Sequence, residues 1–312
     1  MRPQYSIIFF TTLAGIAQGM LFSVAILNLP APVMSSSFLG TTVFAVALIL
    51  LVGGLIASFF HLGHPERAWR SAMMWRTSWL SREVIALPAL IAVTILAEIF
   101  ALQEVLTAWI WIALIVTCLA LWICTAKIYQ CIRFIQEWSH ISTMINFFIL
   151  GLSSGWLLLT ILFFSFEKNR SPFSNSFFPG IALVFLFIAF NLKLWIWQRN
   201  KRLVPKSNLA SATGIKGKQI RQTSMGLMGG SFNTREFFHH QTDKIIANIR
   251  KIILLCAYIL PMILIALAME STHQVPLLCL AFFIQYGGLI AERWMFFAEA
   301  NHPQNLYYQR VS

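Results

Sequence analysis

Apolar residues run along this chain in long blocks, and polar residues are mostly confined to the segments between them. These blocks show neither the period of about two of a half-buried strand nor the period of about 3.6 of an amphipathic helix. A helix of about 20 apolar residues crosses the hydrocarbon core of a bilayer. Eight blocks reach or approach that length, and they predict membrane spans at residues 6–29, 38–60, 84–102, 106–125, 144–164, 179–197, 252–269 and 276–296.

Four arginines separate the second predicted span from the third. An arginine at the centre of a membrane helix costs about 2.5 to 3.5 kcal/mol. The group therefore marks a loop, and it consists of Arg67, Arg70, Arg76 and Arg82. The stretch 126–143, before the fifth span, alternates basic and apolar residues as a segment lying along a membrane surface does.

Composition indicates lipid as the main solvent, because 58% of the residues are hydrophobic and only 11% are charged, against about 25% charged in soluble domains. We therefore predict an all-α integral membrane protein, a bundle of about eight transmembrane helices that forms a single membrane domain over residues 1–312. The first block is longer than the apolar core of about 7 to 15 residues in a signal peptide. We expect it to be a retained span.

Basic residues are divided unequally between the two faces that these spans define. One face receives 19 of the 23 lysines and arginines, and the other receives only Lys168 and Arg170. The positive-inside rule then puts both termini in the cytoplasm of a multi-pass protein of the bacterial inner membrane. The long basic insert, residues 198–250, becomes a cytoplasmic loop that contacts either anionic lipid headgroups or a soluble partner.

Candidate metal and cofactor ligands are few. The five cysteines include no C-x-x-C pair, which argues against an iron-sulfur cluster or a structural zinc site in this chain. All seven histidines fall in loops or at span ends, whereas a membrane haem needs histidine ligands within its helices. We predict no haem, no metal site, no catalytic residue and no nucleic-acid partner.

The densest polar cluster is the loop from residue 59 to residue 84, which His61 and Glu83 bracket at the depth where headgroups meet hydrocarbon. A quinone exchanges protons as well as electrons, so its site needs a histidine that titrates near neutrality and a carboxylate that relays protons. His61 and Glu83 meet these needs, and Arg67 or Arg70 can polarise a carbonyl or hold the loop. We therefore predict that His61, Glu83, Arg67 and Arg70 bind quinone.

Structural interpretations of the same residues remain open. Gly63 followed by Pro65 is an ordinary helix stop, and the arginines also serve as topology signals. Other polar residues inside the spans are functional candidates by default: Gln18, Glu98, Lys193 and Gln285. Lys193 lies near a span end, where its side chain can reach the interface, and we assign Glu98 no role other than that of a helix-end or proton-path residue.

The segment HLGHPERAWR, with SREV closing the loop, resembles the pattern of the membrane anchor subunit of DMSO reductase family molybdoenzymes. The insert segment RQTSMGLMGGSFNTREFFHH and the tail AERWMFFAEANHPQNLYY look more like the anchor of sulfite dehydrogenases in that family. The chain departs from the DMSO reductase anchor at His64 and Glu66, where that anchor has Ser and Met. The resemblance covers most of the chain.

This resemblance implies a complex with a molybdopterin catalytic subunit and an iron-sulfur subunit. The haem-free anchor exchanges electrons with menaquinone or ubiquinone, and His61 and Glu83 correspond to the family's quinone-binding residues. A cytoplasmic site fits the sulfite-oxidising branch, since the DMSO reductase itself exports its catalytic subunits. The alternatives are an anchor that oxidises menaquinol for a DMSO or related reductase, a secondary transporter, and an anchor without a redox role.

Overall fold

The computed structural model describes residues 3–30, 34, 38–60, 62, 64–166, 172–205, 208–216, 220, 239 and 241–303. Eight helices in this part of the chain are long and apolar enough to cross a membrane, and it contains no strand. In order, they are α1 (Tyr5–Asn28), η1 with α3 (Leu39–Phe44 and Ala45–Phe59), α4 (Trp79–Leu102), α5 (Ala108–Gln130), α6 (Ile141–Phe166), α7 (Pro172–Lys201), the continuous run α10, η3 and α11 (Asp243–Ile252, Ile253–Ile259 and Leu260–Glu270), and α12 (Gln274–Ala298).

The eight predicted spans are confirmed, and most ends that differ lie beyond the predicted bounds, although η1 with α3 lies within the predicted span 38–60 and α5 begins at Ala108, after the predicted start at 106. α4 begins at Trp79, before the predicted start at 84, and α10 begins at Asp243, before the predicted start at 252. Hydropathy detects only the part of a helix that lies in hydrocarbon. Helices that continue into the headgroup region therefore look too short in the sequence. For the same reason α5 includes the first residues of the stretch 126–143, which continues as turns up to the start of α6.

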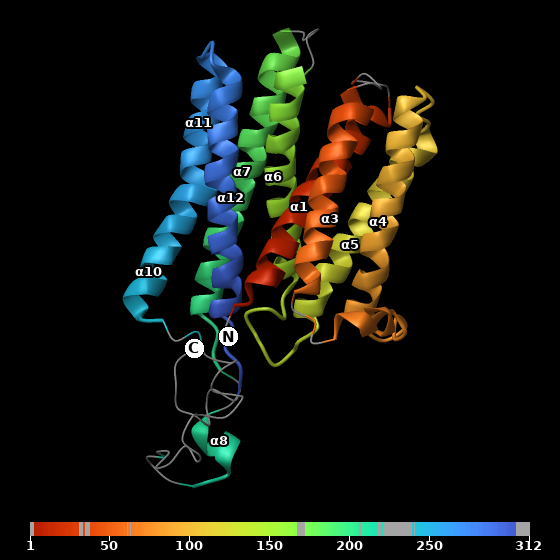
Figure 1. Ribbon diagram of the computed structural model, residues 1–312. Helices are drawn as coiled ribbons and strands as arrows, with labels where there is room; N and C mark the ends of the chain where they lie inside the picture. Colours follow the sequence, from red (N-terminus) through yellow and green to blue (C-terminus); the bar gives the residue numbers. More distant parts are fainter. Residues whose placement is uncertain are drawn as a thin grey trace.

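The helices form two groups that meet along α1 and α6 (Figure 1). The first group contains α1, η1, α3, α4 and α5, and the second contains α6, α7, α10, η3, α11 and α12. α1 packs against α6 and α12 as well as against its own neighbours, α3 and α5. The most deeply buried spans are accordingly α1 and α6, whose apolar windows are 72% and 83% buried.

Glycines make the contact between α1 and α6 a backbone contact. α1 carries Gly15 and Gly19 four residues apart, and α6 carries Gly151 and Gly155 with the same spacing. A Cβ atom on Gly19 would lie 1.8 Å from the carbonyl oxygen of Gly151, and one on Gly155 would lie 2.4 Å from the carbonyl carbon of Gly19. Small residues at this spacing allow membrane helices to approach closely and pack without a hydrophobic driving force.

One end of the bundle, which we call the loop face, carries the start of α1 and the end of α12 (Figure 1). The short helix η2 (Pro65–Ala72) and the turns at residues 131–140 lie at this face, and α8 (Leu209–Thr213) lies beyond it. The even number of spans thus brings both ends of the bundle to one side, as predicted. That this side is the cytoplasm stays a prediction.

Candidate functional site

Glu83 lies inside the bundle at the loop-face end of α4. Ser78 caps the helix by accepting a hydrogen bond from the Ser81 backbone N–H at 3.4 Å. The following turn carries Glu83 into the interior, where only 7% of its surface is exposed. Its Oε1 accepts a hydrogen bond from the Thr125 hydroxyl on α5. The hydrogen-bond donor to Glu83 is thus a neutral hydroxyl group, and burial disfavours the charged form of the carboxyl group.

The two arginines that the sequence assigned to the same site lie on η2 and are exposed. Arg67 is 3.6 Å from the carboxylate of Glu66, and Arg70 lies over the Trp69 ring with 5.5 Å between the guanidinium carbon and the ring centroid. Neither contact reaches Glu83. The structure therefore places the arginines on the surface of the loop and Glu83 beneath it.

Arg82 fixes the end of this loop. Its guanidinium donates to the backbone carbonyls of Trp75 at 2.8 Å and Arg76 at 2.9 Å, and it lies 4.2 Å from the centroid of the Trp79 ring. These contacts fold the loop back onto the start of α4. His61 lies outside the described residues. Its neighbour His64 is exposed, with Nδ1 at 3.0 Å from the Glu66 carboxylate.

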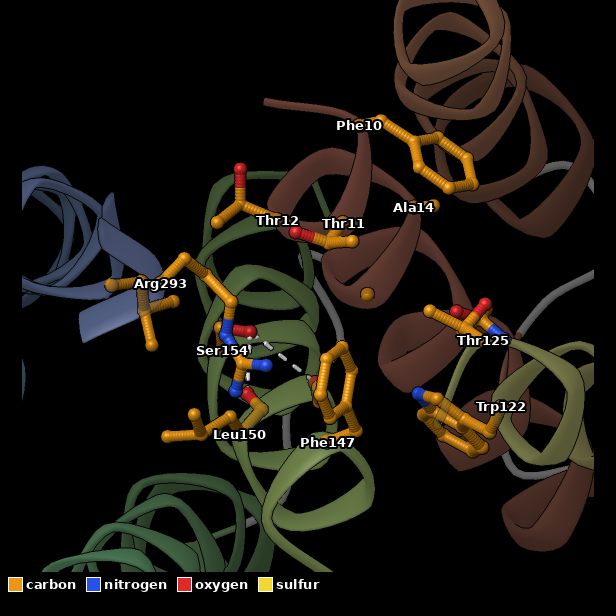
Figure 2. Close-up of a pocket in the computed structure, with 14 residues that line it drawn as sticks. Phe10, Thr11, Thr12, Ala14, Trp122, Thr125, Phe147, Leu150, Ser154 and Arg293 are labelled. Atoms are coloured by element: carbon orange, nitrogen blue, oxygen red, sulfur yellow. Dashed lines mark hydrogen bonds between the residues drawn. The ribbon is translucent and has the colours of Figure 1, made fainter. Parts of the chain in front are cut away.

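A small cavity lies between α1, α5, α6 and α12 (Figure 2). Its volume is about 30 Å³, room for about two waters but not for a quinone ring. Its lining is mostly apolar, and Thr125, Trp122 and Arg293 are among the residues that contribute polar groups to it. Because Thr125 also donates to Glu83, the carboxyl group is one hydrogen bond away from this cavity.

Three charged side chains form a buried cluster on the other side of the cavity, on α7 and α12. Glu292 is fully buried, and Lys193 and Arg293 are 2% and 3% exposed. Lys193 Nζ donates to Glu292 Oε1 at 2.7 Å, and Asn146 Nδ2 donates to the same oxygen at 3.1 Å. Arg293 Nε lies 2.8 Å from Glu292 Oε2 in an ion pair without hydrogen-bond geometry.

The sequence pointed to only one member of this cluster, Lys193, and the predicted environment of its side chain was wrong. Lys193 does not reach the interface as expected, because its ammonium group is buried against Glu292. Glu292 and Arg293 were passed over, although an adjacent acid and base inside the predicted span 276–296 were the available signal. Opposite charges inside a membrane span pair with one another, so a lysine in one apolar block predicts a carboxylate in another.

A larger cavity of about 490 Å³ opens at the loop face between α7, α10 and α12. Its wall includes Glu299, which accepts from Trp197 Nε1 at 3.2 Å and from Arg250 Nε at 3.0 Å. At the same face, burial and the Arg199 cation lower the pKa of His140. The cavity is rich in charged and amide side chains and is lined by residues of the second helix group, so it is separate from Glu83.

Within the described ranges, no three side chains of His, Cys, Asp or Glu come together as a metal site would require. The five cysteines are free thiols. Two comparisons with known proteins bear on the site. The model of a protein family described as "DMSO reductase anchor subunit (DmsC)" matches residues 1–299. The chain is also 41% identical, over 332 aligned positions that cover all of both chains, to a sulfite dehydrogenase subunit of Allochromatium vinosum.

Proposed function

Because this chain belongs to the DMSO reductase anchor subunit family, we propose that it exchanges electrons between the quinone pool and an iron-sulfur subunit. Membership makes the chain a multi-pass membrane anchor of a molybdoenzyme complex. The proposed partners are therefore an iron-sulfur subunit and a molybdopterin catalytic subunit. Quinone, either menaquinone or ubiquinone, is the exchangeable substrate of the anchor.

The buried carboxyl group of Glu83 carries the proposal for the quinone site. It lies at the loop-face end of α4, where a ring at headgroup depth can meet both lipid and a soluble partner. In the proposed mechanism, His61 hydrogen-bonds a quinone oxygen and Glu83 relays protons to or from the ring. Thr125 orients the carboxyl group through its hydrogen bond. This arrangement supplies proton exchange beside a redox ring, which quinone chemistry needs.

Apolar side chains around the loop support entry of the quinone from lipid. Phe59, Phe60 and Leu80 are 40%, 82% and 50% exposed, and they flank the segment that contains His61. An isoprenoid tail can pack against such surface while its ring stays near the loop. Arg67 and Arg70, exposed on η2, are proposed to hold the loop beneath the iron-sulfur subunit and to approach a quinone oxygen once that subunit is bound.

We propose the cytoplasmic face as the side and sulfite as the source of electrons. The distribution of lysine and arginine favours a cytoplasmic loop face, and the full-length relative in Allochromatium vinosum is a sulfite dehydrogenase subunit. In this direction sulfite is oxidised in the catalytic subunit, two electrons pass through the iron-sulfur subunit, and quinone takes up two electrons and two protons. The alternative, an anchor that oxidises menaquinol, uses the same site in reverse.

Copurification tests the proposed complex. Affinity isolation of the tagged chain from its native membranes should recover a molybdopterin protein and an iron-sulfur protein in equal amounts. Deleting the chain should move both proteins, with their activity, to the soluble fraction. Partners without an export signal would support the cytoplasmic side. Recovery of the chain without either partner, combined with solute accumulation by vesicles that contain it alone, would instead favour a transporter.

A further inference from the structure

The buried cluster on α7 and α12 has one positive charge too many. Lys193 and Arg293 share the single carboxylate of Glu292, and all three side chains are at least 96% buried. Both terminal guanidinium nitrogens of Arg293, Nη1 and Nη2, lack a hydrogen-bond partner among the described residues. An unbalanced buried charge is costly unless another group compensates it. The cluster therefore implies a further partner for Arg293.

The free end of Arg293 meets the small cavity near Thr125. Figure 2 shows Arg293 reaching from α12 toward Phe147, with the indole nitrogen of Trp122 turned into the same region. The guanidinium carbon is 3.9 Å from the centroid of the Phe147 ring. The Trp122 Nε1 group is buried and also lacks a hydrogen-bond partner within the described part of the chain. The hydrogen-bond donors of Arg293 and Trp122 at this end of the cavity thus lack acceptors in the described portion of the chain. Water molecules or an anionic group can supply them.

Glu83 is the anionic group on the opposite side. Thr125 lines the cavity and donates to Glu83, so a water that donates to the Thr125 oxygen is linked to the carboxylate. Tyr129, on the same helix as Thr125, lies within electrostatic range of both Glu83 and Arg293. The two charges therefore act on a common buried region between α4, α5 and α12.

The other charged or titratable groups around Glu83 cannot replace Arg293. On α5, Cys124 and Tyr129 are neutral at neutral pH, and the cation of that helix, Lys127, is only partly buried. α3 and η1, which also pack against α4, contain no charged residue. η2 contributes only the exposed side chains of Glu66, Arg67 and Arg70. Arg82 on α4 acts electrostatically on Cys124, as Glu83 does, but its guanidinium makes exposed hydrogen bonds to carbonyls of the loop, where solvent screens its charge.

We propose that Arg293 is the buried counter-charge of Glu83, coupled to it through water held in the cavity between Arg293, Trp122 and Thr125. This inference rests on the proposed quinone function of Glu83. Glu292 holds the guanidinium from α12, and the remaining positive charge favours the ionised form of the Glu83 carboxyl group, which burial disfavours. Arg293 is thus a positioning residue for the quinone site, in a different helix group from the residues beside the ring.

Arg293→Gln tests the coupling in the purified complex. The variant removes the counter-charge and leaves the balanced Lys193–Glu292 pair, so the cluster on α7 and α12 keeps no unpaired charge. The measured quantity is the intensity of the C=O stretching band of protonated Glu83, monitored by infrared difference spectroscopy as the pH is lowered. The band is assigned to Glu83 because it should be absent in Glu83→Gln. We expect the midpoint of this band to rise by about one pH unit. Quinone-linked turnover at neutral pH should fall roughly three- to tenfold.

Lys193→Met is the matched control, because it removes the same charge from the same cluster but leaves Arg293 facing the cavity. It should move the midpoint of the Glu83 band clearly less than Arg293→Gln does, and Arg293→Lys, which keeps a positive charge at the cavity, should leave the midpoint close to that of the unchanged chain. An equal shift in Lys193→Met, or none in Arg293→Gln, would overturn the inference. Neither result would touch the proposed function, which is judged separately by whether quinone turnover depends on Glu83.

Discussion

Replacing Glu83 with Gln should abolish quinone-linked turnover of the complex while its turnover with a soluble artificial electron acceptor persists. Glutamine has nearly the shape of glutamate and can keep the hydrogen bond with Thr125, but it cannot take up or release a proton at neutral pH. A relay that loses its only carboxyl group should lower the quinone rate by roughly 10²- to 10⁴-fold. The artificial acceptor bypasses the membrane site, so its rate measures whether the soluble subunits remain intact.

Glu98→Gln is the matched control for this prediction. Glu98 lies on the same helix, α4, near its opposite end, and has no role in the account. The control should retain full quinone-linked turnover. Thr125→Val keeps the shape of its side chain and removes the hydroxyl that holds Glu83, so we expect an intermediate loss. Undiminished quinone turnover in Glu83→Gln would show that the site lies elsewhere.

The second large effect concerns stability. Glu292→Gln would leave Lys193 and Arg293 buried without the carboxylate that both contact. Breaking a buried ion pair by removing one partner costs about 3 to 5 kcal/mol, because the remaining charge is uncompensated. We expect a markedly lower temperature of thermal unfolding in detergent, measured as the loss of monodisperse protein after heating. We also expect less of the chain in membranes.

A double variant separates charge imbalance from loss of packing. Lys193→Met combined with Glu292→Gln leaves one unpaired cation instead of two, and it should recover part of the stability lost in Glu292→Gln. Lys193→Met alone preserves the Arg293–Glu292 pair and should cost least. If Glu292→Gln were as stable as the unchanged chain, the three side chains would not form the charged cluster described above.

The membrane spans could be predicted because the signal is local. A block of apolar residues identifies a span wherever it lies in the fold, and all eight predicted spans are present in the described part of the chain. The ends of α4 and α10 were harder, since their first turns contain polar residues that hydropathy treats as loop. Helix capping decides such ends, and at α4 the capping residue is Ser78.

The surroundings of each polar side chain could not be predicted in the same way. Glu83 was identified from its position beside a loop, but its partner Thr125 lies on another helix and carries no sequence signal of its own. Lys193 was expected at the interface because it lies near a span end, and the structure buries it against Glu292 instead. Such pairings depend on which helices are neighbours.

The glycines between α1 and α6 also show that a local sequence pattern does not reveal which helices are neighbours. Gly15 and Gly19 on α1 face Gly151 and Gly155 on α6, and their close approach joins the two helix groups. The spacing is visible in the sequence, but it does not say which two helices will meet. The meeting of α1 and α6 brings α12 beside α1, and the small cavity that links Thr125 to Arg293 lies among these helices.

Equilibrium binding of a radiolabelled quinone analogue to the purified complex tests the central claim most directly. The account predicts one displaceable site per anchor, with affinity at least roughly tenfold weaker in Glu83→Gln, since a hydrogen bond to a charged group contributes about 1.5 to 3 kcal/mol. Affinity should be unchanged in Glu98→Gln. Absence of displaceable binding, or a site whose affinity is the same in Glu83→Gln, would contradict a quinone site at the buried carboxyl group of α4.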